Sequence, residues 1–364
     1  MSRSVADSPA LDRRSELELR KIAIGAYAPL TGFMTEEQLN SVVASMRLPD
    51  GRIFPLPVVL EVPGPAGLTP GERVSLTRDG SVIGQIDVQS VFHVDLEETS
   101  ERLFGTGDPA HPGVRAWQSG SGWFAGGPVR LHSEGGSVAL EPWPEPTPAE
   151  MRALFAERGW QTVVAFNTRN IPHRAHEYLH RQALEMADGL LIHPIVGPRK
   201  RGDYTTEAIL TAYRAYISRF LPAGRVVLAP LAIPMRYAGP REAVFHALIR
   251  RNYGCSHLIV GRDHAGVGKW YGLYEAQALA QKLAPELGIQ IVAAAGPFFC
   301  RICDEIVTDR TCPHPETAPE AVIEVSGSAI RAVLTGNGAP HPEFIRPEVV
   351  ASIAGMHPFI EADE

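Results

Sequence analysis

From residue 162 to residue 293, short apolar runs alternate with longer amphipathic stretches. A strand that is buried on both faces is continuously apolar, whereas the apolar residues of an amphipathic helix recur every 3.6 residues. The short apolar runs are therefore interpreted as strands and the longer stretches as helices. The predicted strands are 162–166, 190–195, 226–231, 257–260 and 289–293. The predicted helices are 172–187, 206–220, 241–253 and 273–287. This alternation predicts a doubly wound α/β fold with a parallel sheet.

The first 145 residues have a different texture, with frequent glycine and proline and short β-type runs. Residues 73–77 and 81–86 flank Asp79-Gly80, a pair typical of a tight hairpin turn. One helix is expected, over 15–24, within an otherwise β-rich domain. The proline-rich segment 141–148 is predicted to be a linker. A chain of 364 residues is expected to form two or three domains.

A protein that binds nucleic acid or an anionic membrane surface non-specifically requires a basic face, and the net charge of −7 argues against such a partner. Residues 1–14 are polar and do not resemble a secretory signal. No later stretch offers the roughly 20 apolar residues of a membrane span. These features favour a cytoplasmic protein.

In an open parallel sheet, ligands bind outside the carboxyl ends of the strands. The loop after the first predicted strand carries Arg169, whose planar guanidinium can grip a tetrahedral oxyanion with two hydrogen bonds. Pro172 suits the first position of a helix, and that helix would place His173 and His176 on one face. A His-x-x-His pair alone is more often structural, but its place behind a strand and a polar loop favours a role towards phosphate.

A second loop, 261–268, follows the strand 257–260 and contains three glycines together with Arg262 and His264. Glycines let backbone amides approach phosphate or ribose closely. The spacing matches neither the dinucleotide fingerprint nor a P-loop, so a dehydrogenase or a Walker-type ATPase is not indicated. A third stretch, 235–242, carries Arg236, which could reach anionic substrate groups, whereas Arg241 and Glu242 are interpreted as the start of the helix that follows.

Segments 167–177, 235–242 and 261–268 together resemble the signature segments of the ATP sulfurylase (sulfate adenylyltransferase) family. The likeness extends upstream to 25–34 and downstream to 325–331, and thus covers nearly the whole chain in order. The resemblance implies a PUA-like β domain over 1–145 and a Rossmann-like catalytic domain over 146–298. It also implies a small C-terminal domain over 299–364.

The resemblance implies an activity as well: sulfate attacks the α-phosphate of ATP, bound with Mg²⁺, and the products are adenylyl sulfate and pyrophosphate. The implied catalytic residues are Thr168, Arg169, Asn170, His173 and His176. Sulfate is expected to contact Asn167, Arg169, Arg262, the amide of Ala265 and Arg236. The nucleotide is expected to contact Asn170, His173, His176, Gly261, Arg262, Asp263 and His264. A homodimer is expected, and the reaction is expected to stop at adenylyl sulfate.

Two positions depart from the family's pattern. Asn167 stands where the family has glutamine, one methylene shorter at a position expected to donate to the oxyanion, and Ile171 replaces a proline. An adenylyltransferase of the same fold acting on a different oxyanion or acid is therefore the alternative. A non-catalytic nucleotide- or RNA-binding protein is a second alternative, but the acidic charge and the intact histidine pair count against it.

Three cysteines lie within thirteen residues, as Cys300-x-x-Cys303 followed by Cys312, and His314 comes two residues later. Such a set suits a tetrahedral structural zinc, with Glu316 as a rival for the fourth position. The other interpretation is three reduced, buried cysteines without metal. Cys255 lies outside the cluster and is expected in the core.

Overall fold

The structure is a computed structural model and describes residues 8–65, 67–132, 143–325, 327–335 and 342–362. Residues 141–142 of the predicted linker lie outside the described part. The chain divides into two compact units. The first unit contains Met1–Phe155, Ala232–Gly254 and Asp263–Gln290; the second contains Ala156–Leu231, Cys255–Arg262 and Ile291–Glu364. Among the described helices, none combines the length and apolar character that crossing a bilayer requires.

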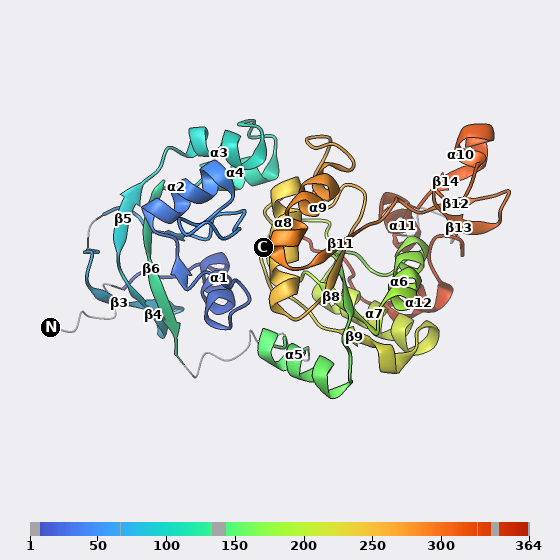
Figure 1. Cartoon of the computed structure of the whole chain (residues 1–364), viewed down its shortest axis with the longest axis horizontal. Helices are drawn as coiled ribbons and strands as arrows, with labels where there is room; N and C mark the ends of the chain where they lie inside the picture. The colour runs from blue at the N-terminus through green and yellow to red at the C-terminus, as the bar shows by residue number, and fades with distance from the viewer. Residues whose placement is uncertain (1–7, 66, 133–142, 326, 336–341, 363–364) are drawn as a thin grey trace. The chain divides into compact units, whose positions relative to one another are not determined.

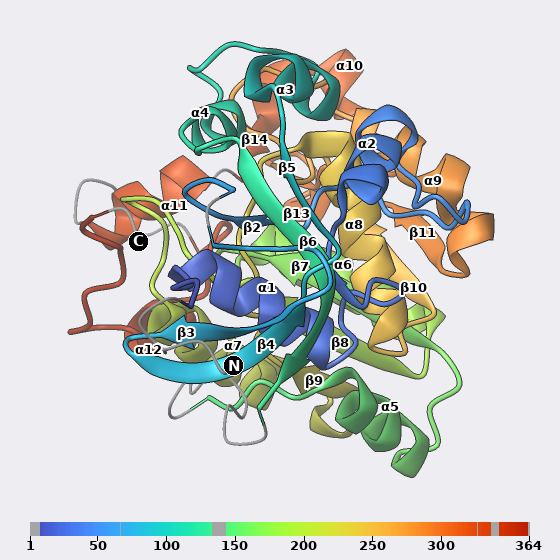
Figure 2. The same cartoon turned by 90° about the vertical axis from the view of Figure 1, so that its left-hand side faces the viewer.

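The first unit contains an antiparallel sheet of six strands (Figure 2). Its strands are β1 (Gly32–Phe33), β2 (Leu60–Glu61), β3 (Arg73–Arg78), β4 (Ser81–Asp87), β5 (Ser90–His93) and β6 (Trp123–Leu131). The order is β1-β6-β4-β3, and β2 and β5 also pair with β6. The predicted hairpin is confirmed: Asp79 and Gly80 join β3 to β4 with φ angles of 48° and 78°. Both angles lie in the left-handed region that an Asp-Gly turn supplies.

Four helices accompany this sheet: α1 (Arg13–Ala23), α2 (Glu36–Ser45), α3 (Leu96–Phe104) and α4 (Pro112–Gln118). The prediction of a single helix in this region is therefore wrong. The three additional helices begin at strong caps. Thr35 forms a capping box with Gln38, and Asp95 and His111 accept backbone N–H groups with their side chains. These caps stabilise short helices that lack a long amphipathic pattern.

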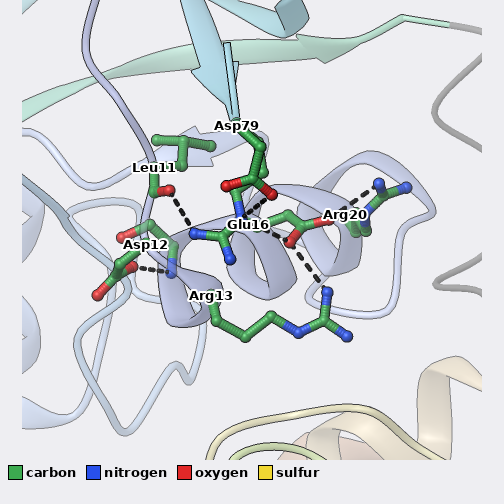
Figure 3. Close-up of polar contacts among 8 residues, drawn as sticks. Leu11, Asp12, Arg13, Glu16, Arg20 and Asp79 are labelled. Carbon is green, nitrogen blue, oxygen red and sulfur yellow. Dashed lines mark hydrogen bonds and ion pairs between the residues drawn. The ribbon is translucent and has the colours of Figure 1, made fainter. Parts of the chain in front are cut away.

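One buried carboxylate fixes α1 to the β3–β4 hairpin (Figure 3). Glu16 accepts hydrogen bonds from Arg13 at 2.9 Å and from Arg20 at 3.0 Å. Arg78, at the end of β3, lies 3.6 Å from the same carboxylate and donates to the carbonyl of Leu11 at 3.0 Å. Three guanidiniums therefore surround one carboxylate, and together they hold the helix on the sheet.

Three further helices complete the first unit. α5 (Pro148–Glu157) starts at the end of the predicted linker, and most of its length lies in this unit. α8 (Gly239–Asn252) and α9 (Glu275–Leu287) pack against each other and confirm the helices predicted there. α9 ends at Gly288, which has a φ of 72° and caps the helix in the left-handed conformation.

The second unit contains the predicted parallel sheet, with strands β7 (Val163–Thr168), β8 (Gly189–Pro194), β9 (Val226–Leu228), β10 (His257–Val260) and β11 (Gln290–Ala293). The order is β11-β10-β7-β8-β9, and β10 with β7, β7 with β8 and β8 with β9 are parallel pairs. The chain thus winds outward in both directions from β7. This is the doubly wound, Rossmann-like order, and the prediction of fold class is confirmed.

Three helices of the second unit, α6 (Arg174–Met186), α7 (Thr206–Phe220) and α12 (Pro347–Ser352), form a common core with β7 and β8. Figure 1 labels the three helices and β8. Buried Val164 and Ile192 of the strands meet Leu179 of α6 and Ile209 of α7 in this core. α6 begins at Arg174 and not at Pro172 as predicted. A proline disfavours the helical conformation of the residue before it, which agrees with a helix that starts after Ile171. The structure starts the helix two residues later than Pro172, with His173 as the N-cap.

A small antiparallel sheet follows in the second unit, with strands β12 (Phe298–Cys300), β13 (Glu305–Val307) and β14 (Val322–Glu324) in the order β13-β12-β14. The helices α10 (His314–Thr317) and α11 (Gly327–Leu334) lie before and after β14 in the chain. Cys300 pairs with Glu305 on one side and with Val322 on the other. The cysteine-rich segment is therefore built into a sheet.

Candidate active site

The centre of the parallel sheet is where its winding direction changes. β7 and β10 are neighbours there, and Ile259 of β10 lies opposite Phe166 of β7. The chain leaves β7 after Thr168 on its way to α6, and it leaves β10 after Val260. Because parallel strands end at the same edge, the two loops start side by side. The structure therefore brings Arg169 and Arg262 to one edge of one sheet.

The loop after β7 is closed by a tight polar turn. The amide of Asn170 donates to Oγ1 of Thr168 at 3.0 Å, and this hydroxyl lies 3.3 Å from the carbonyl of Asn170. Thr168 is buried, whereas Asn167, Arg169 and Asn170 are half-buried. The turn therefore fixes the backbone of Thr168–Asn170 and leaves the neighbouring polar side chains partly accessible.

His173 and His176 are stacked on each other, with ring centroids 3.6 Å apart and planes at 27°. His173 is buried and His176 is half-buried, with its ring edge against Phe166. The three-residue spacing of His173 and His176 predicted that their side chains lie on the same side, and the stacked rings confirm this. The first N–H of the helix, from Arg174, donates to the carbonyl of Phe344 at 2.8 Å. That donor is engaged inside the unit.

Burial keeps these imidazoles neutral. Desolvation lowers the pKa of His173 to about 3, and it lowers the pKa of His176 well below its usual range, with further lowering from His173 and His180. A neutral imidazole offers one N–H donor and one acceptor. The pair can thus donate hydrogen bonds to an anion without carrying positive charge.

Sequence reasoning missed three side chains that complete this group, namely Tyr213, His180 and Tyr216. Tyr213 of α7 is fully buried, and its hydroxyl lies 3.2 Å from Nδ1 of His176. His180 is fully buried one turn along α6, and its Nδ1 lies 3.4 Å from the hydroxyl of Tyr216. The signal in the sequence is weak: two tyrosines three residues apart on the buried face of a helix look like ordinary core residues.

Arg262 extends from the end of β10 towards the small C-terminal sheet. Its Nη1 lies 3.2 Å from Oε1 of Glu324 on β14. A Cβ placed on Gly296 would come within 3.1 Å of Cδ of Arg262, so the arginine stem passes close to the backbone there. Gly261, just before Arg262, is half-buried, and a Cβ added to it would meet no other part of the protein within 4 Å.

The remaining predicted residues of the loop belong to the first unit. Asp263 and Ala265 have positive φ angles of 52° and 56°, and the carbonyl of Ala265 accepts the amide of Gly239 at 3.2 Å. Nε2 of His264 lies 3.1 Å from Nδ1 of His246, which is fully buried in α8. The loop is therefore held against α8 by backbone and side-chain contacts.

Arg236 is buried in the first unit, where its Nη2 donates to Oε1 of Glu18 at 2.6 Å. Its backbone amide donates to Glu242 at 2.9 Å. The guanidinium thus forms an internal ion pair with α1. Its predicted contact with an anionic substrate stays a prediction.

The four predicted metal ligands form a compact cluster in which all ligand atoms lie within 4.8 Å of one another. Nδ1 of His314 is 3.3 Å from Sγ of Cys300, 3.4 Å from Sγ of Cys303 and 3.3 Å from Sγ of Cys312. The sulfurs of Cys303 and Cys312 are 3.7 Å apart. Tetrahedral zinc with Zn–S bonds of about 2.3 Å separates its sulfurs by about 3.8 Å. The donor set and its spacing therefore fit this metal, and Glu316 is not part of the cluster.

Comparisons with known proteins agree with this geometry. The family described as ATP-sulfurylase matches residues 145–355, and the PUA-like domain family matches residues 3–134. A sulfate adenylyltransferase of Chloroflexus aurantiacus is 45% identical over 344 residues, which are 93% of this chain and 88% of that protein. One from Symbiobacterium thermophilum is 46% identical over 349 residues, with 93% and 86% covered. A solved structure titled hexameric APS kinase from Thiobacillus denitrificans aligns with a TM-score of 0.72 at 26% identity, over 95% of this chain and 62% of that one.

Proposed function

The chain belongs to the ATP sulfurylase family, and we propose that the carboxyl edge of its parallel sheet holds the residues that carry out the family's reaction. The chain is a nucleotidyltransferase that converts ATP and sulfate to adenylyl sulfate and pyrophosphate. The observation that carries the proposal is the adjacency of β7 and β10. Because the two strands are neighbours, the loops that carry Arg169 and Arg262 begin side by side, and the first of them leads to the stacked histidines.

Arg169 and Arg262 are proposed to bind sulfate between them, together with Asn167. Two guanidiniums can offer paired N–H donors to the tetrahedral dianion and balance its charge. The half-buried position of Arg169 and Asn167 supports this role, because donors shielded from water hold an anion more strongly. The predicted role of Ala265 rests on the resemblance, and that of Arg236 rests on its place between a strand and a helix.

The reaction is proposed to be a direct displacement. An oxygen of sulfate forms a bond to the α-phosphorus of ATP, and the bond from that phosphorus to the bridging oxygen breaks on the opposite side. Its electron pair leaves with pyrophosphate. Because no covalent intermediate on the protein is required, catalysis consists of positioning and charge stabilisation. Mg²⁺ accompanies ATP in this family and, when bound, neutralises charge on the phosphates.

His173 and His176 are proposed to donate hydrogen bonds to the pyrophosphate as it leaves. Their neutral state supports this, since a neutral N–H donor stabilises developing negative charge without holding the product as tightly as a cation would. Thr168 and Asn170 are proposed to contact the nucleotide through the turn that they form. Gly261, Asp263 and His264 are proposed to contact the adenosine, by resemblance.

The cluster of Cys300, Cys303, Cys312 and His314 is proposed to hold a structural zinc ion. When bound, zinc would link the turn between β12 and β13 to the segment before α10, and thereby stabilise the small sheet. We also propose the domain limits 1–145, 146–298 and 299–364, and a homodimer, the commonest symmetric assembly.

A sulfate-dependent pyrophosphate release assay on wild type, His176→Ala and His357→Ala tests the proposal. His176→Ala is expected to lower kcat by about 10²–10³-fold, the usual cost of removing one preorganised donor. His357 is exposed and lies outside the proposed site, so its variant is the matched control. Selenate, sulfite and phosphate in the same assay test the alternative of a different oxyanion. Wild-type kcat in His176→Ala would reject the proposed role of this histidine.

A further inference from the structure

His176 has one ring nitrogen anchored inside the protein. Its Nδ1 is 3.2 Å from the hydroxyl of Tyr213, which projects from α7. Both residues belong to the second unit, and Tyr213 is completely buried. Among the described residues, Nε2 of His176 has no hydrogen-bond partner, and the side chain is half-buried. The accessible nitrogen of this ring is therefore Nε2.

Tyr213 has a second polar neighbour. This neighbour is the side chain of Thr168, whose Oγ1 accepts the amide of Asn170 at 3.0 Å and donates to the carbonyl of Asn170 at 3.3 Å. The single proton of the threonine hydroxyl is therefore engaged with the Asn170 carbonyl, whereas the proton of the Tyr213 hydroxyl has Nδ1 of His176 within hydrogen-bond distance. A buried O–H that did not donate would be left unpaired, which costs free energy, so the tyrosine is the donor expected in this contact.

We propose that Tyr213 is a positioning residue whose hydroxyl donates to Nδ1 of His176 and thereby holds this ring in the tautomer that carries its proton on Nε2. The inference rests on the proposed role of His176 towards pyrophosphate and adds the means by which that role is set.

The tautomer matters because a neutral imidazole has only one N–H. With the proton on Nε2, the accessible nitrogen donates to an anionic oxygen. With the proton on Nδ1, a lone pair would face that oxygen and repel it. Burial raises the pKa of Tyr213 well above its usual range, so the phenol keeps the proton that it must donate.

The same two helices offer a matched control. Tyr216 is also fully buried on α7, and its hydroxyl lies 3.4 Å from Nδ1 of His180. His180 is fully buried, and its Nε2 has no partner among the described residues. Tyr213→Phe and Tyr216→Phe thus each remove one hydroxyl from a Tyr–His contact, but only the first contact involves an accessible histidine.

The experiment measures histidine ¹⁵N chemical shifts by NMR, together with kcat and thermal stability, in wild type and both variants. The wild-type spectrum is expected to show His176 protonated on Nε2 with a hydrogen-bonded Nδ1. In Tyr213→Phe the Nδ1 shift should move and kcat should fall about tenfold, while the KM for sulfate changes less than twofold. Tyr216→Phe should keep wild-type kcat and the wild-type shifts of His176.

Three results would overturn the inference. A proton on Nδ1 of His176 in the wild type contradicts it directly, whatever the activity. Wild-type kcat in Tyr213→Phe, with His176→Ala impaired, rejects the positioning role and leaves the proposed function standing. Wild-type kcat in His176→Ala rejects both.

Discussion

Arg262 and Glu324 form an ion pair between the end of β10 and the end of β14, with Nη1 and Oε1 3.2 Å apart. Both side chains are exposed, by 40% and 65%. Ion pairs this exposed contribute about 1 kcal/mol or less, so a bound sulfate can replace the carboxylate. The pair also links the proposed anion-binding arginine to the sheet that carries the cysteine cluster, because Glu324 lies opposite Phe298 in that sheet.

Glu324→Gln is expected to lower the KM for sulfate about two- to fivefold, because sulfate no longer competes with a carboxylate for Arg262. The kcat should stay near wild type. Initial rates at varied sulfate measure both constants. Glu320→Gln, an exposed neighbour in the sequence, is the control and should change neither. An unchanged or higher KM for sulfate in Glu324→Gln would mean that the pair does not limit anion binding.

Glu16 is expected to make the first unit sensitive to acid. Burial raises the pKa of its carboxyl, but hydrogen bonds from Arg13 and Arg20 lower it more, so the pKa lies below the ordinary value of 4.5. A carboxyl with a depressed folded-state pKa stabilises the fold above its unfolded pKa, and this contribution is lost as pH falls through the folded pKa. The loss should therefore begin below about pH 4.5.

Thermal unfolding of Glu16→Gln between pH 3 and pH 7 checks this expectation. The variant should have a lower Tm than wild type at pH 7, and the difference should shrink towards pH 3. Glu37→Gln removes an exposed carboxylate of α2 and serves as the control. A difference in Tm that is constant across the pH range would show that ionisation of Glu16 does not contribute.

The parallel sheet was predictable because each strand is a continuous apolar run between helical patterns. The helix 206–220 and the strand 257–260 were predicted with the bounds that the structure has. In the first unit, glycine and proline concealed α2, α3 and α4, which are shorter than the window in which a helical period can be detected. Their caps, at Thr35 and Asp95, were the available signal.

The two motif loops were predictable because polar and glycine-rich segments directly follow apolar strands. Their partners were not. Tyr213 lies 37 residues from His176, and Glu324 lies 62 residues from Arg262. Such pairs form because the fold brings segments that are distant in the sequence into contact. No local sequence pattern encodes these contacts. The internal pair of Arg236 with Glu18, 218 residues away, is a further contact that no local pattern indicates.

Asn167→Gln is expected to lower the KM for sulfate by about tenfold or more, and to change the KM for ATP less. The longer side chain can reach the anion with a full hydrogen bond, and such a bond to a charged group contributes about 1.5–3 kcal/mol. Gln161→Asn, an exposed position just before the same strand, is the control for a changed amide length. Initial rates at varied sulfate and varied ATP separate the two constants. An unchanged KM for sulfate would remove Asn167 from the proposed anion site.

The cysteine cluster predicts about one zinc ion per chain, held by four ligand atoms whose spacing fits a tetrahedron. Cys303→Ser replaces a thiolate with a poor zinc ligand, so the zinc content and the Tm should both fall. Cys255 is buried in the same unit but outside the cluster, and Cys255→Ala should keep its zinc. Metal analysis by mass spectrometry, before and after treatment with a chelator, measures the zinc content.

Because β14 carries Glu324, loss of zinc should also change the KM for sulfate through Arg262, and this change should disappear in Glu324→Gln. Zinc near zero in the untreated protein would contradict the metal site, and a persistent change of KM in the Glu324 variant would contradict the proposed link.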